Sequence, residues 1–323
     1  MAEDVQMSAI RTFQHQHAQL PRACVLILSF PTHCGEDCSR GNHHTQDWNV
    51  EHMVGSLEKH FFQPQARYPV VIFHEDYTSD QERSVARRTH SPTIFSRVDL
   101  GPGALPEYLN LSAIAQVVGP AHRNGNLSLP ARRGTYHGFG YRMMCRFFGM
   151  LVMRTPLMLE FDWYMRVDGG DSRITGDLKI DPISVLLAGR ARYGYLSIEV
   201  AARNSRLDKV LRRFREEHPE VQPDQALVKP FVDAHGDYNG RYYYNNFEVL
   251  HLPTFRSTLA QSLFDAVDRS GAFMLGDTHR ANLGDADFRS MTIPFLLNKS
   301  EVVRFRSKDI PYHHPMPWDA PYV

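Results

Sequence analysis

The chain has 323 residues, of which 42% are hydrophobic, 22% charged and 11% aromatic, a composition that excludes a disordered or fibrous protein. Its 36 basic and 36 acidic residues balance to a net charge of +0, which excludes a global attraction to nucleic acid or anionic lipid. The short basic pairs at 87–88 and 132–133 lack aromatic residues for base stacking, so we expect no nucleic-acid binding.

The amino terminus and the cysteines give little information about the compartment. Residues 1–22 form a polar extension without the apolar segment of a signal peptide, and no apolar run approaches the ~20 residues that span a bilayer. The 4 cysteines are too few for a disulfide scaffold, and Cys34 and Cys38 lack a second pair at zinc-like spacing. Three Asn-x-Ser sequons suit a secretory lumen but arise readily by chance, so the compartment stays open.

The first part of the chain is expected to form a strand, a helix and a second strand. Residues 23–30 form a continuous apolar run and residues 68–76 contain a second apolar segment, as in strands that are buried on both faces. Between them, Asn49 can cap a helix whose apolar residues recur at helical spacing. Such a unit favours a parallel sheet, in which ligands bind beyond the carboxyl ends of the strands. We therefore expect the loops at residues 31–33 and 74–76 to matter most.

The rest of the chain continues the α/β pattern. In order, we expect a surface excursion with a short helix at 112–118, a helix over 141–161, a strand at 161–168, a helix from Pro182, a strand at 193–200 and an amphipathic helix over 207–220. No internal repeat or linker interrupts it. We therefore expect one α/β domain over residues 23–323.

Two carboxylates follow the strand predicted at 161–168. Asp168 and Asp171 are three residues apart and separated by two glycines. Mg²⁺ and Mn²⁺ prefer oxygen ligands and commonly bridge carboxylates to substrate phosphates, which makes this pair a candidate metal site. Because Asp and Gly are also the usual residues of turns, a plain turn is the alternative.

Two further clusters carry polar side chains. Residues 242–248 combine aromatic residues, amides and Glu248, as in sites that stack on a sugar ring and bond its hydroxyls; a structural strand explains them equally well. Residues 284–289 contain Asp285, Asp287 and Arg289 before an apolar segment. Either a helix start or a loop facing phosphate would explain this second cluster.

These clusters occur together in an order that resembles the fungal-type Golgi α-1,2-mannosyltransferases, the family of glycolipid 2-α-mannosyltransferases. The resemblance runs from about Cys24 to His314. Where the family has Tyr-Arg-His-Met-Cys-Arg-Phe, this chain has Tyr141-Arg142-Met143-Met144-Cys145-Arg146-Phe147. The other matching stretches are 164–168, 181–182, 193–195, 246–249, 255–257, 284–286 and 312–315.

The resemblance implies a GT-A-like glycosyltransferase with a mixed, mainly parallel sheet, flanking helices and a Rossmann-like nucleotide-binding half. It implies a retaining, metal-dependent transfer of a sugar, with GDP-mannose as the usual donor and a glycan hydroxyl as acceptor, and with Mn²⁺ or Mg²⁺ as cofactor. Glu248 resembles the acid at the anomeric centre, and Tyr141 the tyrosine near the reacting sugars. The implied donor-binding residues are Asp168, Asp171, Arg142, Arg146, Asn246, Asp285 and Arg289, of which Asp168 and Asp171 would also bind the metal.

Three departures from the family pattern bear on these roles. Asp168 stands where the family has a longer Glu, and Asp171 can supply the lost reach. Arg289 replaces a family histidine; arginine is no neutral metal ligand but pairs with phosphate oxygens, so metal dependence is open. The loop after the first strand has Phe30-Pro31-Thr32-His33 in place of Val-Arg-Asn, so the donor preference can differ.

Alternatives follow from these departures. A non-catalytic protein on the same fold, binding carbohydrate or nucleotide-sugar, would retain the donor site, and a transferase with another nucleotide-sugar donor is also compatible with the sequence. A glycoside hydrolase needs a second pocket acid, which is not evident near Glu248. Family-typical location would be the Golgi lumen after removal of an anchor; otherwise we expect a soluble cytoplasmic enzyme.

Overall fold

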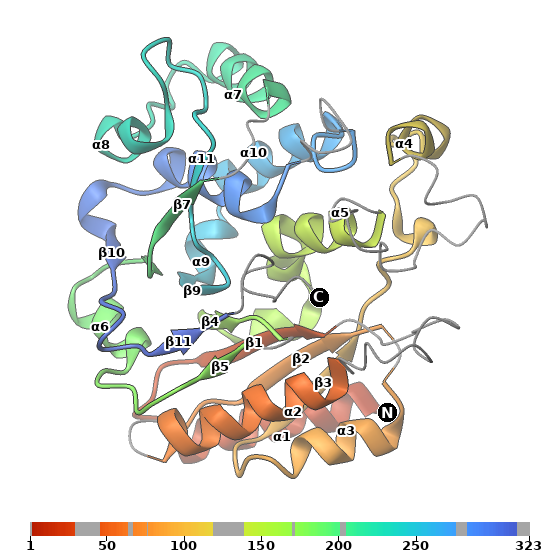
Figure 1. The fold of residues 1–323 in the computed structure, drawn as a ribbon, viewed down its shortest axis with the longest axis vertical. Helices are drawn as coiled ribbons and strands as arrows, with labels where there is room; N and C mark the ends of the chain where they lie inside the picture. Colours follow the sequence, from red (N-terminus) through yellow and green to blue (C-terminus); the bar gives the residue numbers. More distant parts are fainter. Residues whose placement is uncertain are drawn as a thin grey trace, which may run out of the picture.

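In a computed structural model, the chain is described over residues 2–29, 46–63, 67–75, 77–118, 139–169, 172–200, 205–275 and 283–314. Over these residues, the main sheet has seven strands in the order β10-β6-β9-β4-β1-β2-β3. The strands are β1 (Ala23–Ser29), β2 (Val70–His74), β3 (Thr93–Arg97), β4 (Trp163–Val167), β6 (Tyr193–Tyr195), β9 (Phe247–His251) and β10 (Val302–Arg304). Figure 1 shows this sheet between two layers of helices.

One strand of the sheet runs against its neighbours. The pairs β1–β2, β2–β3, β1–β4 and β6–β10 are parallel, whereas β9 pairs antiparallel with both β4 and β6. In the β4–β9 register, Val167 lies opposite Phe247. The carboxyl end of β4 therefore meets the amino end of β9 at one edge of the sheet.

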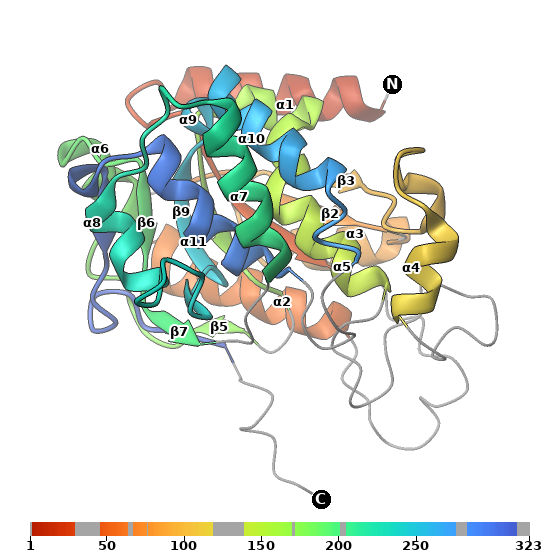
Figure 2. The same ribbon diagram turned by 90° about the horizontal axis from the view of Figure 1, so that it is seen from above.

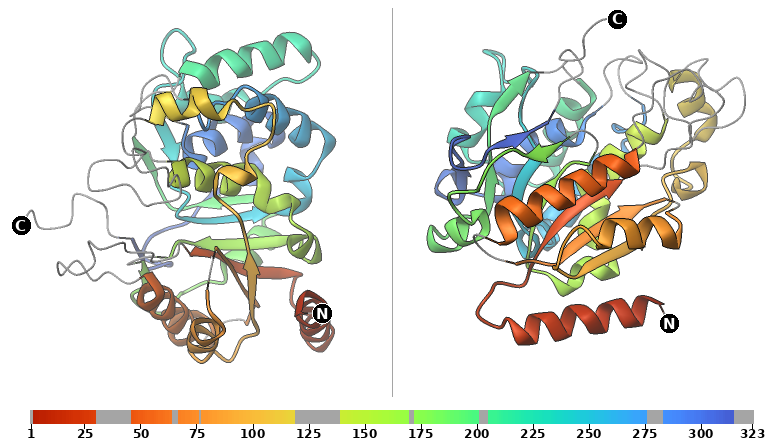
Figure 3. Two further views of the ribbon diagram at one scale, coloured as in Figure 1. Left: turned by 90° about the vertical axis from the view of Figure 1, so that its right-hand side faces the viewer. Right: turned by 60° about the horizontal axis from the view of Figure 1, so that its bottom comes forward.

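Alternate residues of β1 pack into two separate cores, one on each face of the sheet. Cys24, Leu26 and Leu28 face a core formed with α5 (Phe139–Arg146), α10 (Thr258–Arg269) and α11 (Asp285–Leu296). Val25 and Ile27 face a core formed with α2 (Gln46–Leu57). The left view of Figure 3 shows helices on both sides of the sheet. Burial of both faces explains why β1 is apolar throughout and not alternating.

Smaller elements surround this centre. Two short sheets pair β5 (Arg173–Ile174) with β11 (Tyr312–His313) and β7 (Ile198–Val200) with β8 (Arg241–Tyr243). The other α-helices are α3 (Ser79–Ala86), α4 (Leu111–Val118), α6 (Pro182–Ala188), α7 (Ser205–Glu217), α8 (Gln225–Val228) and α9 (Leu252–Phe255). Single π-helical turns, η2 (Glu58–Phe62) and η5 (Phe147–Leu151), extend α2 and α5, and short 3₁₀ turns are η3 (Pro102–Ala104), η6 (Val152–Arg154), η7 (Pro156–Glu160), η8 (Lys229–Phe231) and η9 (Lys299–Glu301).

The segment that the sequence set apart as a polar extension contains a helix, α1 (Ala2–Gln16). Its Ile10 is fully buried in the core, and Arg11 Nη2 donates a hydrogen bond of 2.8 Å to Glu160 Oε1 at the end of η7. Figure 2 shows α1 along one edge of the molecule. The division of the chain at residue 22 stays a prediction. No helix within the described ranges combines the length and apolar character that crossing a bilayer requires.

Most predicted elements are confirmed, but two segments that were expected to be continuous are each divided between two sheets. The strands predicted at 23–30 and 68–76 and the helices predicted at 112–118, from Pro182 and at 207–220 correspond to β1, β2, α4, α6 and α7; α7 ends at Glu217, three residues before the predicted end. The strand predicted at 193–200 divides into β6 and β7, which belong to different sheets, and the aromatic segment at 242–248 divides into β8 and β9. The second break falls at Asn245 and Asn246, whose side-chain amides bond carboxylates outside either strand.

The helix predicted over 141–161 begins as α5 but does not continue as one element. After Arg146 the chain passes through the π-helical turn η5 and the 3₁₀ turns η6 and η7. Pro156 stands at the first position of η7, where its ring suits a helix start and breaks the preceding helix.

Candidate functional site

The candidate site lies where β4 ends and β9 begins. Asp168 directly follows β4, and Asn246 directly precedes β9. The backbone N–H of Asp168 donates to the carbonyl of Asn246 at 3.1 Å, and Asn246 Nδ2 donates to Asp168 Oδ2 at 2.7 Å. The side chain of Asp168 keeps 21% of its surface exposed. This carboxylate is therefore held at the edge of the sheet with a face open to solvent.

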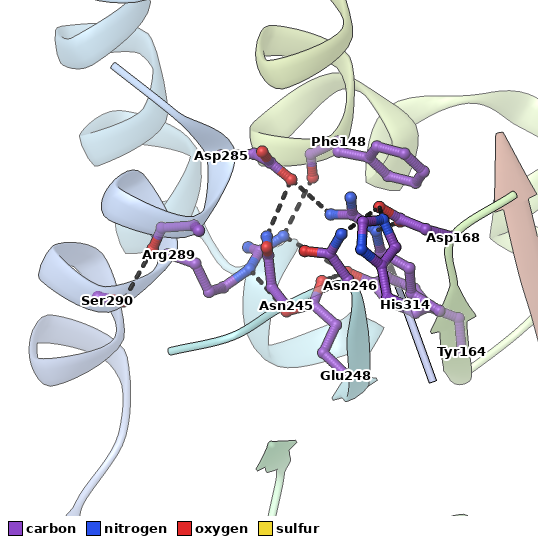
Figure 4. Close-up of polar contacts among 12 residues, drawn as sticks. Phe148, Tyr164, Asp168, Asn245, Asn246, Glu248, Asp285, Arg289, Ser290 and His314 are labelled. Carbon is purple, nitrogen blue, oxygen red and sulfur yellow. Dashed lines mark hydrogen bonds and ion pairs between the residues drawn. The ribbon is translucent and has the colours of Figure 1, made fainter. Parts of the chain in front are cut away.

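Strand alternation places the polar residues of this region on one face of the sheet. Tyr164 and Arg166 of β4 and Asp168, which follows this strand, stand at every second position. Asn246, which precedes β9, and Glu248 of β9 do the same. Arg166 and Glu248 are register partners. Figure 4 shows Tyr164, Asp168, Asn246 and Glu248 beside Asp285 and Arg289, which α11 contributes.

Arg166 is the centre of the polar network. Its guanidinium is almost fully buried, and its Cζ lies 3.7 Å from the centre of the Phe148 ring. Arg166 Nε donates to Asp168 Oδ1 at 2.8 Å, and Nη1 donates to Asp285 Oδ2. Asn245 Nδ2 also donates to Asp285, at 2.9 Å. Arg166 thus bridges the carboxylates of Asp168 and Asp285.

The two acids respond differently to this arrangement. Burial raises the pKa of Asp168 above its ordinary value, because its desolvation outweighs the charges of Arg166 and His314. Burial acts in the same direction on Asp285, but there the charge of Arg166 and the hydrogen bonds from Arg166 and Asn245 outweigh it, so the pKa of Asp285 is lowered. The arrangement therefore favours the ionised form of Asp285, which pairs with Arg166.

Glu248 lies deeper than Asp168 and has no exposed surface. Tyr164 OH donates to Glu248 Oε1 at 2.6 Å, and Arg289 Nε lies 3.4 Å from Glu248 Oε2. Arg289 is also fully buried, and its Nη2 donates to the carbonyl of Phe148 at 3.0 Å. In this structure Glu248 therefore presents no atom to a sugar, and Arg289 faces Glu248 and not a phosphate group. The catalytic role of Glu248 and the donor role of Arg289 stay predictions.

Of the three residues predicted on α5, Arg142 and Arg146 lie on one face of that helix and Tyr141 on another. Tyr141 is 38% exposed, and Cys145, burial and the nearby carboxylate of Asp285 raise its pKa well above the ordinary value. Arg142 Nη1 donates to the carbonyl of Met274 at 3.0 Å, and Arg146 forms two hydrogen bonds of 2.7 Å with Asp268 of α10. Tyr141 thus lies toward the site, whereas Arg142 and Arg146 tie α5 to the segment around α10.

His314 is a site residue that was not selected from the sequence. Its Nε2 lies 4.0 Å from Asp168 Oδ2, and its ring meets that of Tyr244 edge-on at 6.3 Å between centres. The backbone N–H of Asp168 also donates to Tyr312 OH at 3.3 Å. The signal was present as the matching stretch at 312–315, but nothing in the sequence places that stretch beside Asp168.

The protein groups near Asp168 provide two donors for a divalent cation. Over the described ranges, no three His, Cys, Asp or Glu side chains form a group that would hold an ion by themselves. Asp168 and His314 are a carboxylate and an imidazole, which Mn²⁺ accepts, and a metal that bridges a diphosphate commonly has only one or two protein carboxylates. The residues present therefore fit a cation shared with a substrate. Asp171, Cys34, Cys38 and the loop at 31–33 lie outside the described residues.

Comparison with solved structures defines the class of fold. Core-mannan synthase A from Aspergillus fumigatus, in a Mn/GDP form, is similar with a TM-score of 0.73 and 16% identity over 92% of this chain and 76% of that chain. The mannosyltransferase Ktr4p from Saccharomyces cerevisiae in complex with GDP gives a TM-score of 0.71 and 15% identity over 97% of this chain and 81% of that chain. The fold is therefore GT-A-like, as the sequence predicted.

The family follows from the sequence comparisons. The model of the glycolipid 2-alpha-mannosyltransferase family matches residues 41–322, so the chain belongs to that family. The alpha-1,2 mannosyltransferase KTR1 of Saccharomyces cerevisiae is 27% identical over 272 residues, which are 83% of this chain and 65% of that relative. The glycolipid 2-alpha-mannosyltransferase of the same yeast is 27% identical over 276 residues, 84% of this chain and 57% of that relative. The chain thus spans less than two thirds of the length of either relative.

Proposed function

We propose that this protein is a retaining glycosyltransferase that moves mannose from GDP-mannose to a hydroxyl of a glycan acceptor. The observation that carries the proposal is the partly exposed Asp168, held by Arg166 and Asn246 and approached by His314 to 4.0 Å. The names of the relatives, and the GDP in two similar solved structures, support mannose and GDP as the chemistry to test first.

In this proposal, Asp168 and His314 hold Mn²⁺ or Mg²⁺ against the diphosphate of the donor. The ion supplies positive charge to oppose the charge that develops on the departing diphosphate. Arg166 and Asn246 each hold one oxygen of Asp168, so the carboxylate keeps one orientation while a donor binds. Preorganised polar groups of this kind need no rearrangement during the reaction.

Tyr141 is the predicted catalytic residue with a surface open to substrate. Its ring is exposed at the start of α5 beside the acidic start of α11. In the proposed reaction it contacts the reacting sugars, and its hydroxyl stays protonated because its pKa is raised well above the ordinary value. Glu248, which is buried behind Tyr164, contributes negative charge near the anomeric carbon without touching the sugar.

The first experiment measures the melting temperature with GDP, UDP, Mn²⁺ and their combinations. A ligand at about 100 times its dissociation constant stabilises the folded state by about 2.7 kcal/mol, which raises the melting temperature by several degrees. We expect the largest rise with GDP and Mn²⁺ together. Transfer is then measured by mass spectrometry with GDP-mannose and a methyl mannoside acceptor.

Matched variants locate the site. Asp168→Asn and His314→Gln should abolish the additional rise that Mn²⁺ gives in the presence of GDP. His313→Gln, which changes the exposed neighbour of His314, should leave that rise intact. No response to GDP with Mn²⁺ in the unaltered protein would refute the proposed donor and metal.

A second candidate function has one observation in its favour. Glu248 is fully buried and faces Arg289, so the acid predicted at the anomeric centre is not available in this structure. A protein that binds a nucleotide-sugar without transferring it would show the same GDP and Mn²⁺ response but no product. The mass-spectrometric assay separates the two functions.

We further propose the Golgi lumen as the location, on the resemblance to Golgi mannosyltransferases. Fluorescence microscopy of the tagged full-length protein, with a Golgi marker, tests this. A cytoplasmic signal would instead favour the soluble alternative.

A further inference from the structure

Four buried charges form an alternating arrangement under α11. Arg166 of β4 and Glu248 of β9 are register partners, while Asp285 and Arg289 are one turn apart on the helix above them. Asp285 pairs with Arg166, and Arg289 pairs with Glu248. We call Arg166, Glu248, Asp285 and Arg289 the charge quartet. Each of its charges pairs with an opposite charge on the facing element.

The quartet is sealed from solvent. Glu248 and Arg289 have no exposed surface, and Arg166 and Asp285 are buried. An ion in such a place requires a partner, because removing one member of a buried pair leaves an uncompensated charge. Glu248 Oε2 and Arg289 Nε form no hydrogen bond of good geometry, so the 3.4 Å ion pair is the interaction that holds that carboxylate oxygen.

Arg289 also affects which carboxylates Arg166 pairs with. Arg166 faces three carboxylates, namely Asp168, Asp285 and Glu248, and all three raise its pKa. Glu248 further faces Tyr164 of β4 and Tyr193 of β6, both neutral because their pKa values are raised well above ordinary. Without Arg289, the positive charge nearest to Glu248 would be Arg166. Arg166 would then be drawn away from Asp168.

We propose that Arg289 is a positioning residue which, by holding Glu248, leaves Arg166 free to fix Asp168 for binding of the donor diphosphate and its cation. This inference rests on the proposed function for the identity of the ligand. The charge quartet itself is independent of that identity. Arg289 acts through Glu248 and Arg166 and touches no substrate.

The test measures the dissociation constant of GDP in the presence of Mn²⁺ by calorimetry, together with the melting temperature. Arg289→Met should weaken GDP binding about tenfold or more, as changes to groups that orient metal ligands commonly do. Arg289→Lys, which keeps the charge, should bind within about threefold of the unaltered protein on the same reasoning. The double variant Arg289→Met with Glu248→Gln removes the competing carboxylate and should recover most of the lost affinity.

A second buried carboxylate provides the matched control. Glu58 of η2 accepts hydrogen bonds from Thr89 and His90, so Glu58→Gln should lower the melting temperature and leave the GDP dissociation constant unchanged. If Arg289 acted only on stability, Arg289→Met would behave like Glu58→Gln. That result, or a double variant no better than Arg289→Met, overturns the proposal.

The melting temperatures distinguish this failure from that of the proposed function. Arg289→Met should melt lower than the double variant, since only the single variant buries a charged Glu248 without its Arg289 partner. The unaltered protein could bind no GDP while the melting temperatures still show this coupling between Arg289 and Glu248. In that case the proposed donor and the positioning of a GDP site are both refuted, and only the coupling within the charge quartet is confirmed. If the changes in melting temperature of Arg289→Met and Glu248→Gln add up to that of the double variant, the coupling within the charge quartet is refuted.

Discussion

The strongest prediction concerns Arg166, because two ion pairs depend on it. Arg166→Met keeps most of the side-chain volume but removes the charge between Asp168 and Asp285, and with it the stacking on Phe148. Breaking a buried pair by removing one partner costs about 3–5 kcal/mol, and a buried cation over an aromatic ring contributes about 1–2 kcal/mol. Because Asp168 is partly exposed, solvent offsets part of its loss. We therefore expect a loss of about 3–5 kcal/mol in the free energy of unfolding.

Equilibrium urea unfolding measures this loss, and fluorescence of Trp163, which is buried on the same strand as Arg166, reports it. Arg154→Met is the matched control. Arg154 Nη2 lies 2.7 Å from Asp265 Oδ1, as close as the buried pairs, but the two side chains are 32% and 54% exposed. That substitution should cost less than about 1 kcal/mol. An equal effect of both substitutions would refute the argument that burial makes Arg166 important.

Three further predictions test other parts of the structure. Burial, with a contribution from Asp285, raises the pKa of Asp287 to about 7 from its ordinary 3.8. Because the folded state holds this proton more tightly than the unfolded state, the free energy of unfolding should fall as pH rises from about 4 to about 7. Asp287→Asn should remove this pH dependence in urea titrations. Gly194→Ala would place a Cβ 2.4 Å from the Phe305 ring and should cost about 1–3 kcal/mol, whereas Gly55→Ala meets nothing within 4 Å inside α2 and should stabilise by about 0.5–1 kcal/mol. Tyr141→Phe should lower kcat about tenfold or more and change the melting temperature little, because the substitution keeps the aromatic ring and removes only the hydroxyl. Unchanged turnover would exclude the hydroxyl of Tyr141 from the reaction.

The sequence predicted the elements that depend on local patterns. The apolar run of β1, the proline at the start of α6 and the amphipathic face of α7 each carry a local signal. The breaks at 196–197 and 244–246 do not, because tertiary contacts determine them. Tyr195 pairs with Glu248 in the main sheet, while Ile198, three residues later, pairs with Tyr243 in another sheet. The alternation of side chains along the chain is the same before and after such a change of pairing strand, so it gives no signal of the break.

The candidate site was predictable in composition but not in arrangement. Asp168, Asn246 and Asp285 were selected from the sequence, and the structure brings them together through direct hydrogen bonds or through Arg166. The sequence could not show that His314 approaches Asp168 or that Arg289 faces Glu248. Both contacts join segments distant along the chain, and their geometry depends on how α11 and the carboxyl-terminal segment cross the sheet.

The reversed direction of β9 has a consequence for variation among related proteins. Because β9 opposes β4, the long connection from β6 to β9 returns to the sheet at the rim where Asp168 lies. Insertions and deletions in that connection, which carries α7 and α8, can remodel the surroundings of the rim while the seven strands keep their register. Changes of loop length alone can therefore reshape the surface beside Asp168, with the strands that hold this carboxylate left unchanged.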